Sequence, residues 1–214
     1  METYEKKRCW SVLFRLFHWM YALSIMTLCT TGIYINSPWT DTMIEGSASF
    51  PMANMRLIHF TAAYVFLGAV IIRAFLYIFG NPQERVWDIL PITRRNIRNL
   101  YRTILRYLYL TEDHEIRLGH NVLAGVTYLF TFCVALLMIV SGFYMLFPEA
   151  PTWQGIGTAI FGSQQWARFL HHLGMWWFML FALIHVYMCI WNDVKEPEVL
   201  IASIVSGDKL LQKK

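Results

Sequence analysis

The sequence predicts an all-α integral membrane protein in which four helices form a transmembrane bundle. Hydrophobic residues make up 57% of the 214 residues and charged residues only 15%, whereas soluble domains average about 45–50% apolar and about 25% charged residues. The mean hydropathy is +0.41. Four apolar stretches are also present, and each is long enough to cross a bilayer, which needs about 20 such residues.

These stretches cover about residues 13–35, 55–79, 119–147 and 169–191. A chain in lipid must satisfy its own backbone hydrogen bonds, so each stretch is predicted to be an α-helix. The first is too long for a cleaved signal peptide and has no small-residue cleavage motif at its end. Residues 1–214 are interpreted as a single membrane domain.

The distribution of lysine and arginine predicts the orientation of these helices, because cytoplasmic loops carry an excess of both residues. Both termini and the long loop between the second and third spans are basic. The other two loops instead hold Asp41, Glu45 and Glu149, with Arg56 and Arg168 at their far edges. Both termini and the long loop are therefore predicted to be cytoplasmic. Their basic residues are Lys6, Lys7, Arg8, Arg15, Arg85, Arg94, Arg95, Arg98, Arg102, Arg106, Arg117, Lys195, Lys209, Lys213 and Lys214.

The long loop contains an amphipathic pattern. Arginines recur every four residues from Arg94 to Arg106, and apolar residues such as Ile97 and Leu108 form another face. This pattern predicts a helix lying on the cytoplasmic membrane surface. The tail from Val199 to Leu211 is a weaker candidate for a second such helix.

Composition excludes several other classes. The formal net charge of +4 does not indicate nucleic-acid binding, because the basic residues flank apolar spans. The four cysteines form no C-x-x-C or C-x-x-C-H motif, which argues against iron–sulfur ligation and covalently attached c-type haem.

Histidines are the main functional signal. Six of the seven lie in or beside the spans, and only His114 lies clearly in a loop. Ionisable residues at membrane depth are costly and mark functional sites. The six are His18, His59, His120, His171, His172 and His185.

The spacing between His171 and His185 selects ligands. Fourteen helical residues bring two side chains within about 40° of the same face and about 21 Å apart along the axis. The thirteen-residue step from His172 points away, so His171 is preferred as the ligand. With the predicted orientation, His59 and His171 lie near the outer membrane face, and His18 and His185 lie near the inner face.

Two histidine pairs at matched depth favour two haems with two axial imidazoles each, a ligation suited to electron transfer. Zinc is the competing metal, but it usually takes four ligands together. Arg15, Arg56 and Arg168 each precede a proposed ligand by three residues. Such arginines could bind haem propionates, or they could reach lipid headgroups and signal topology.

Glycines inside the spans are compatible with two roles. They could let a porphyrin lie close to the backbone, or they could serve helix–helix contact. The glycines concerned are Gly32, Gly68, Gly125, Gly142 and Gly174.

Several motifs resemble the cytochrome b subunit of membrane-bound nickel–iron hydrogenases, a family of four-helix di-haem b cytochromes related to the formate dehydrogenase cytochrome b. They are Arg15-Leu-Phe-His18-Trp19, Arg56-Leu-Ile-His59-Phe60, Gly119-His120-Asn121, and His171-His172-Leu-Gly-Met-Trp176 through His185-Val-Tyr-Met188. The resemblance covers nearly the whole chain, including Gly80-Asn81 and Ile204-Val-Ser-Gly207.

The resemblance implies a function in the bacterial inner membrane. Hydrogenase large (nickel–iron) and small (iron–sulfur) subunits on the outer face would oxidise H2, and this chain would carry no nickel–iron site of its own. As their electron-transfer subunit, it would pass electrons through the haem of His59 and His171 and then that of His18 and His185 to the membrane quinone pool.

The resemblance also implies a quinone site at the cytoplasmic start of the third span. Asn121 could hydrogen-bond the quinone head with His120 nearby, or it could cap the helix. His172 occupies a variable position of the family and receives no general role.

Two other functions stay open. One is the cytochrome b subunit of a formate dehydrogenase or thiosulfate reductase. The other, from a different class, is a haem-free membrane anchor or a transporter whose buried histidines relay protons.

Overall fold

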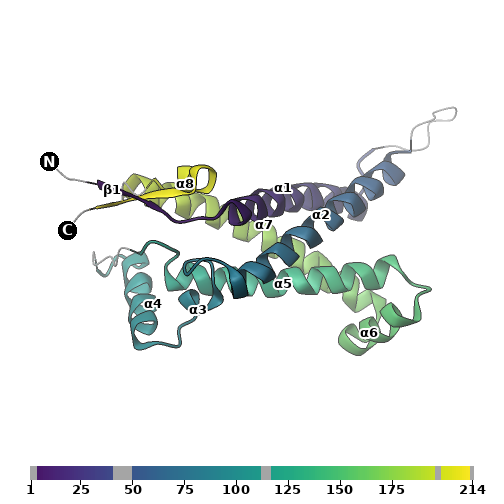
Figure 1. The fold of residues 1–214 in the computed structure, drawn as a ribbon. Helices are drawn as coiled ribbons and strands as arrows, with labels where there is room; N and C mark the ends of the chain where they lie inside the picture. The colour runs from purple at the N-terminus through teal and green to yellow at the C-terminus, as the bar shows by residue number, and fades with distance from the viewer. Residues whose placement is uncertain (1–3, 41–49, 112–116, 196–198, 213–214) are drawn as a thin grey trace. The chain divides into compact units, whose positions relative to one another are not determined.

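The computed structural model describes residues 4–40, 50–111, 117–195 and 199–212 (Figure 1). Within these residues four helices are long and apolar enough to cross a membrane. They are α1 (Val12–Asn36), α2 (Pro51–Phe79), α5 (Val122–Leu146) and α7 (Gln164–Lys195). The predicted all-α membrane class with four spanning helices is confirmed. The residues Asp41, Glu45 and His114, which entered the sequence argument, lie outside the described part of the chain.

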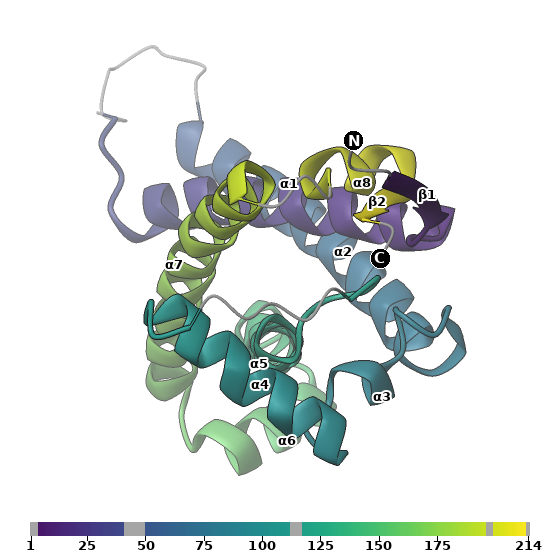
Figure 2. The same cartoon turned by 90° about the vertical axis from the view of Figure 1, so that its left-hand side faces the viewer.

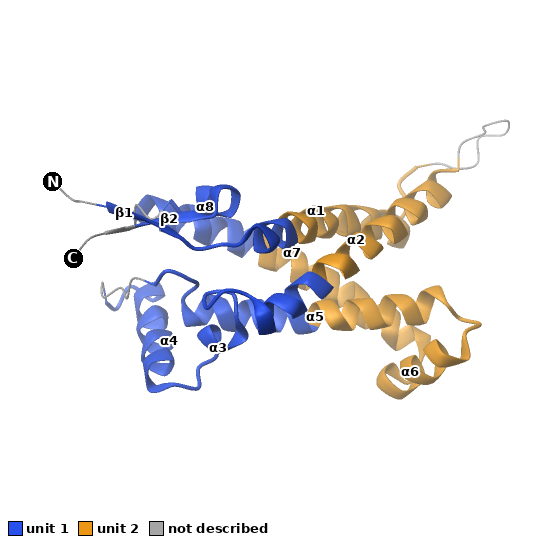
Figure 3. Ribbon diagram, viewed as in Figure 1, with its two compact units in different colours: residues 1–18, 71–133, 183–214 blue, residues 19–70, 134–182 orange. Residues whose placement is uncertain are grey.

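The described chain forms two compact units (Figure 3). Unit 1 contains residues 1–18, 71–133 and 183–214, and unit 2 contains residues 19–70 and 134–182. Each of the four long helices supplies a segment to each unit. The single domain expected for residues 1–214 stays a prediction.

Unit 1 joins the two ends of the chain. Strand β1 (Tyr4–Arg8) pairs antiparallel with β2 (Asp208–Gln212), beside the short helix α8 (Leu200–Ser206) (Figure 2). The amides of Cys9 and Trp10 both donate to the Gly207 carbonyl, at 2.8 and 3.0 Å. Gly207 has a φ of +89°, a left-handed conformation that glycine adopts without steric cost.

The core of unit 1 forms where the first turns of α1 meet the last turns of α2. Its buried members are Cys9, Trp10, Phe14 and Leu76, and Leu13, Phe17, Ile72, Leu118 and Ile204 pack against them. The buried Glu84 carboxylate joins the two segments, because it accepts from the amides of Ser11 at 2.7 Å and Asn81 at 3.0 Å. Removing that carboxylate would leave two backbone donors without their partner.

The long loop carries α3 (Val86–Ile89) and α4 (Arg94–Tyr107), both in unit 1. The predicted amphipathic helix is thus present as α4, and the Thr93 side chain caps it by accepting from the Asn96 amide. Asn96 and Asn99 are buried, and the Asn99 side chain accepts from the Val122 amide at 3.0 Å. Arg94, Arg98, Arg102 and Ile97 are exposed, whereas Arg106 is half-buried, and the membrane-surface location stays a prediction.

The structure corrects the expectation of one helix through the tail. Helix α8 ends at Gly207, and Leu210 and Leu211 lie in β2 instead. The left-handed glycine stops the helix, and the strand then finds a partner about two hundred residues earlier in the sequence. The pairing also requires both chain ends to lie on the same side of the membrane, although which side stays a prediction.

Unit 2 packs segments of all four long helices. Rings from α1, α2 and α7 meet there: Tyr21 stacks on Phe66 at 5.0 Å between centroids, and Phe178 meets Phe66 edge-on at 5.9 Å. Helix α6 (Pro151–Phe161), which the sequence argument did not anticipate, packs on α5 through Tyr144 and Phe161. Gly157 allows this approach, since a Cβ there would lie 2.1 Å from the Tyr144 ring.

Candidate metal centres

In unit 1, His18 of α1 and His185 of α7 face each other. Their ring centroids are 6.3 Å apart and the ring planes differ by 46°. A metal–imidazole bond is about 2.0–2.1 Å long, and the ring centre lies about 1.1 Å behind the bonding nitrogen. Two imidazoles on opposite sides of one metal ion therefore have ring centroids about 6 Å apart. The observed separation therefore fits a metal held from both sides, as in bis-histidine haem.

Tyr128 and Cys189 lie beside His185 of this pair. The Tyr128 hydroxyl lies 3.3 Å from Nδ1 of His185, and the two rings meet edge-on at 5.7 Å. The Cys189 sulfur lies 3.8 Å from Nε2 of His185, one helical turn away. Tyr128 is thus a neighbour of the site that the sequence analysis did not single out.

His120 also lies beside Tyr128, just before α5. Its ring stacks on Trp10 at 4.7 Å and meets Tyr128 edge-on at 4.7 Å. Burial, followed by the positive charge of nearby Lys209, lowers the pKa of His120 well below the usual value for histidine. The ring is therefore neutral at physiological pH and can both donate and accept a hydrogen bond.

Asn121 performs the capping function that the sequence left open. Its Oδ1 accepts from the Ala124 amide at 2.8 Å at the start of α5, and its Nδ2 lies 3.4 Å from the Tyr107 hydroxyl. Burial raises the pKa of the Tyr107 phenol, which keeps the phenol protonated. Contact of Asn121 with a quinone stays a prediction.

In unit 2, His59 of α2 and His171 of α7 each contact a hydroxyl of a neighbouring helix. Nδ1 of His59 lies 2.8 Å from the Thr31 hydroxyl of α1, and Nδ1 of His171 lies 2.8 Å from the Ser141 hydroxyl of α5. In each ring the Nδ1 atom is therefore held by a neighbouring helix, and the Nε2 atom is the one available to a metal.

Glycines Gly32 and Gly142 follow these two hydroxyl residues in the sequence. A Cβ at Gly32 would lie 3.6 Å from Cε1 of His59, and a Cβ at Gly142 would lie 3.6 Å from Cε1 of His171. Each glycine therefore lies directly beside the imidazole of a proposed ligand. Gly125 and Gly174 instead serve helix packing, against Ile89 and Met138 respectively.

His172 makes a contact of its own. Its Nε2 accepts a hydrogen bond from Nε1 of Trp176 at 3.0 Å, one turn further along α7. The neighbouring His171 is the residue held by Ser141, so the two histidines face different surroundings, as the thirteen- and fourteen-residue steps predict.

The three arginines differ in their contacts. Arg15 donates from Nη1 to the Val205 carbonyl, while its buried Nε has no hydrogen-bond partner among the described residues. Arg56 and Arg168 are exposed. A role for any of them in binding propionates stays a prediction.

The structure adds one buried cation that the sequence analysis missed. Arg73 of α2 is 5% exposed and donates to the Glu84 carbonyl at 3.1 Å. Its guanidinium lies 3.9 Å from the Tyr77 ring centre and 5.1 Å from that of Phe14. An arginine inside an apolar span is the signal that could have identified it.

Among the described residues, no three or more His, Cys, Asp or Glu side chains gather as a metal site. The His18–His185 pair is a two-histidine arrangement, which suits haem, whose porphyrin supplies the other four ligands. Apolar spanning helices and paired imidazoles together define the class of membrane-embedded b-type cytochromes.

Comparison with known proteins identifies the family. The sequence model of the prokaryotic cytochrome b561 family matches residues 9–207, and the chain belongs to this family. It is 34% identical over 201 residues to the "Probable Ni/Fe-hydrogenase B-type cytochrome subunit" of Cupriavidus necator, covering 90% of this chain and 82% of the relative.

Two further relatives have similar names. The corresponding protein of Azotobacter vinelandii is 31% identical over 92% of this chain and 86% of its own length. The "Probable Ni/Fe-hydrogenase 1 B-type cytochrome subunit" of Escherichia coli strain K12 is 29% identical over 90% of this chain and 86% of its own. The resemblance predicted from the sequence is therefore confirmed.

Proposed function

We propose that this chain is the di-haem b-type cytochrome subunit that connects a periplasmic nickel–iron hydrogenase to the membrane quinone pool. The observation that carries the proposal is the His18–His185 pair in unit 1, supported by the matching hydroxyl contacts of His59 and His171 in unit 2. Haem iron held by two imidazoles would accept and give up one electron at a time.

The protein would act by holding and orienting these groups. The apolar helices keep water from the sites, and the hydroxyls of Thr31 and Ser141 fix the orientation of two imidazoles. Arg15, Arg56 and Arg168 are the residues proposed to hold propionates.

The names of the relatives support the small and large subunits of a nickel–iron hydrogenase as partners of this chain. A formate dehydrogenase or thiosulfate reductase is the second possibility, but none of the relatives compared here has such a name. Membership of a cytochrome family argues against a haem-free anchor or transporter.

Quinone would bind near His120 and Asn121 in unit 1. The neutral His120 ring, the Tyr128 phenol and the Tyr107–Asn121 contact supply donors and acceptors close to the His18–His185 pair. Reduction of a quinone takes up two protons as well as two electrons, so polar groups that can donate and accept are suited to this place.

Single histidine substitutions test the proposal. The purified wild-type protein is expected to contain two haems per chain, and His18→Ala, His59→Ala, His171→Ala and His185→Ala are each expected to contain one, because a bis-imidazole site needs both ligands. Haem is measured from the reduced-minus-oxidised spectrum, and quinone reduction is measured in membranes supplied with H2.

His172→Ala is the matched control, since its ring is occupied by Trp176, and it should keep both haems. Loss of haem in this control together with retention in His171→Ala would refute the pairing. Normal haem content in all four ligand variants would refute the di-haem function.

A further inference from the structure

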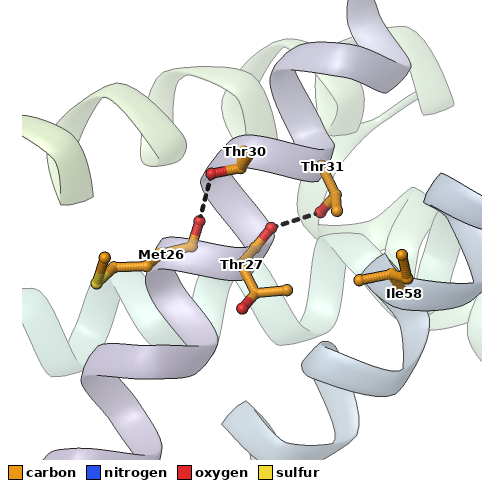
Figure 4. Close-up of a pocket in the computed structure, with 5 residues that line it drawn as sticks. All are labelled: Met26, Thr27, Thr30, Thr31 and Ile58. Carbon is orange, nitrogen blue, oxygen red and sulfur yellow. Dashed lines mark hydrogen bonds between the residues drawn. The ribbon is translucent and has the colours of Figure 1, made fainter.

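Thr31 and Ser141 share an unusual set of contacts. Each hydroxyl lies five residues before the end of a spanning helix and is buried, with Thr31 4% and Ser141 0% exposed. Each also lies close to the carbonyl four residues earlier, at 2.7 Å for Thr31 to Thr27 and 2.8 Å for Ser141 to Leu137. Figure 4 shows the Thr31–Thr27 bond. Thr31 is one of the residues that line a pocket of about 340 Å³.

These contacts determine the direction of the bond to the imidazole. A hydroxyl has a single proton, and the short bond to the preceding carbonyl uses it. The hydroxyl oxygen must then accept from Nδ1–H of the histidine, 2.8 Å away at both sites. Both His59 and His171 are therefore held as the tautomer with a free electron pair on Nε2.

A glycine follows each of the two hydroxyl residues, so Thr31 and Ser141 share a second feature. Thr31-Gly32 on α1 serves His59 of α2, and Ser141-Gly142 on α5 serves His171 of α7. In both cases the hydroxyl binds the rear of the ring while the glycine leaves space beside Cε1. The same two-residue device thus occurs once for each proposed ligand of the unit 2 site.

We infer that Thr31 and Ser141 are positioning residues. They fix the ligating tautomer of His59 and His171, and they lower the reduction potential of the haem that these two histidines would hold. The inference rests on the proposed haem function. A hydrogen bond accepted from Nδ1–H makes Nε2 a stronger electron donor. A stronger donor stabilises ferric iron more than ferrous iron, which lowers the potential.

The test removes one hydroxyl at a time in a protein that holds only this haem. The background is His18→Ala, in which the unit 1 site lacks one ligand. Thr31→Val and Ser141→Ala are expected to shift the midpoint potential upward in a spectroscopic redox titration, and the double variant is expected to shift it further. Haem transfer to an excess of a haem-scavenging protein should be about tenfold faster in each variant, the loss typical of such partners.

Three controls separate this inference from a structural effect. Thr30→Val removes an exposed hydroxyl that donates to the Met26 carbonyl (Figure 4), and it should leave the potential unchanged. Thr31→Ser and Ser141→Thr keep a hydroxyl and should restore the wild-type potential.

An unchanged potential in Thr31→Val and Ser141→Ala, with haem still bound, would overturn the inference and leave the haem function intact. An equal shift in Thr30→Val would overturn it as well. Failure of the haem function would instead be seen earlier, as haem content that does not depend on His59 or His171.

Discussion

Two glycines of α6 differ in what surrounds them. A Cβ at Gly157 would lie 2.1 Å from the Tyr144 ring, whereas a Cβ at Gly155 would have nothing within 4 Å. Gly157→Ala is expected to destabilise the protein by about 1–3 kcal/mol through overpacking. Gly155→Ala is expected to be neutral or to stabilise it by up to about 1 kcal/mol, because alanine favours helix.

Thermal unfolding of both variants in detergent measures the difference. A lower unfolding temperature for Gly155→Ala than for Gly157→Ala would contradict the packing of α6 on Tyr144.

At the residue scale, the sequence suggested ligands, whose role stays a prediction, but it did not indicate the hydroxyls that contact them. The fourteen-residue step distinguished His171 from His172 because helix geometry depends only on spacing. Thr31 and Ser141 lie 28 and 30 residues from the histidines they contact. Their role depends on which helices are neighbours, and periodicity carries no such information.

Helix α4 presents an exposed surface that includes both charged and apolar side chains. Ile97, Tyr101 and Leu108 are exposed, while the buried positions are the polar Asn96 and Asn99. A helix that lies in the interface of a bilayer places its apolar side chains among acyl chains and its arginines near anionic headgroups.

A spin label placed on this helix tests that location in vesicles. After the native cysteines are replaced by alanine, a label at Ile97→Cys is expected to be more accessible to oxygen than to a water-soluble relaxation agent. A label at Arg98→Cys should show the reverse preference. Equal access of both labels to the aqueous agent would mean that α4 does not lie on the membrane.

At the element scale, apolar length was enough to predict the four spanning helices, because a continuous apolar segment in lipid satisfies its own backbone hydrogen bonds only as a helix. The ends were less predictable: α7 begins at Gln164 and α5 at Val122. Helix ends depend on caps such as Asn121, and α6 lies in a loop without a clear amphipathic pattern. The strands pair across nearly the whole chain, which no local pattern can indicate.

At the scale of the whole molecule, β1 pairs with β2, so both strands lie on the same side of the membrane. The orientation to be determined is whether that side is cytoplasmic or periplasmic. The basic residues predict that this paired end is cytoplasmic. A fluorescent protein fused after Lys214 is expected to fluoresce, and alkaline phosphatase at the same place should be inactive. Phosphatase inserted at Gly162, between α6 and α7, should be active, and the opposite pattern would reverse the predicted topology.

The joined chain ends also determine when folding can finish. The amides of Cys9 and Trp10 bind the Gly207 carbonyl, and β1 pairs with a strand that follows it by about two hundred residues. The first strand must therefore wait until β2 has been synthesised before it gains its partner. A chain truncated just before Gly207 would keep all four spanning helices, but its first strand would have no partner and would be open to proteolysis.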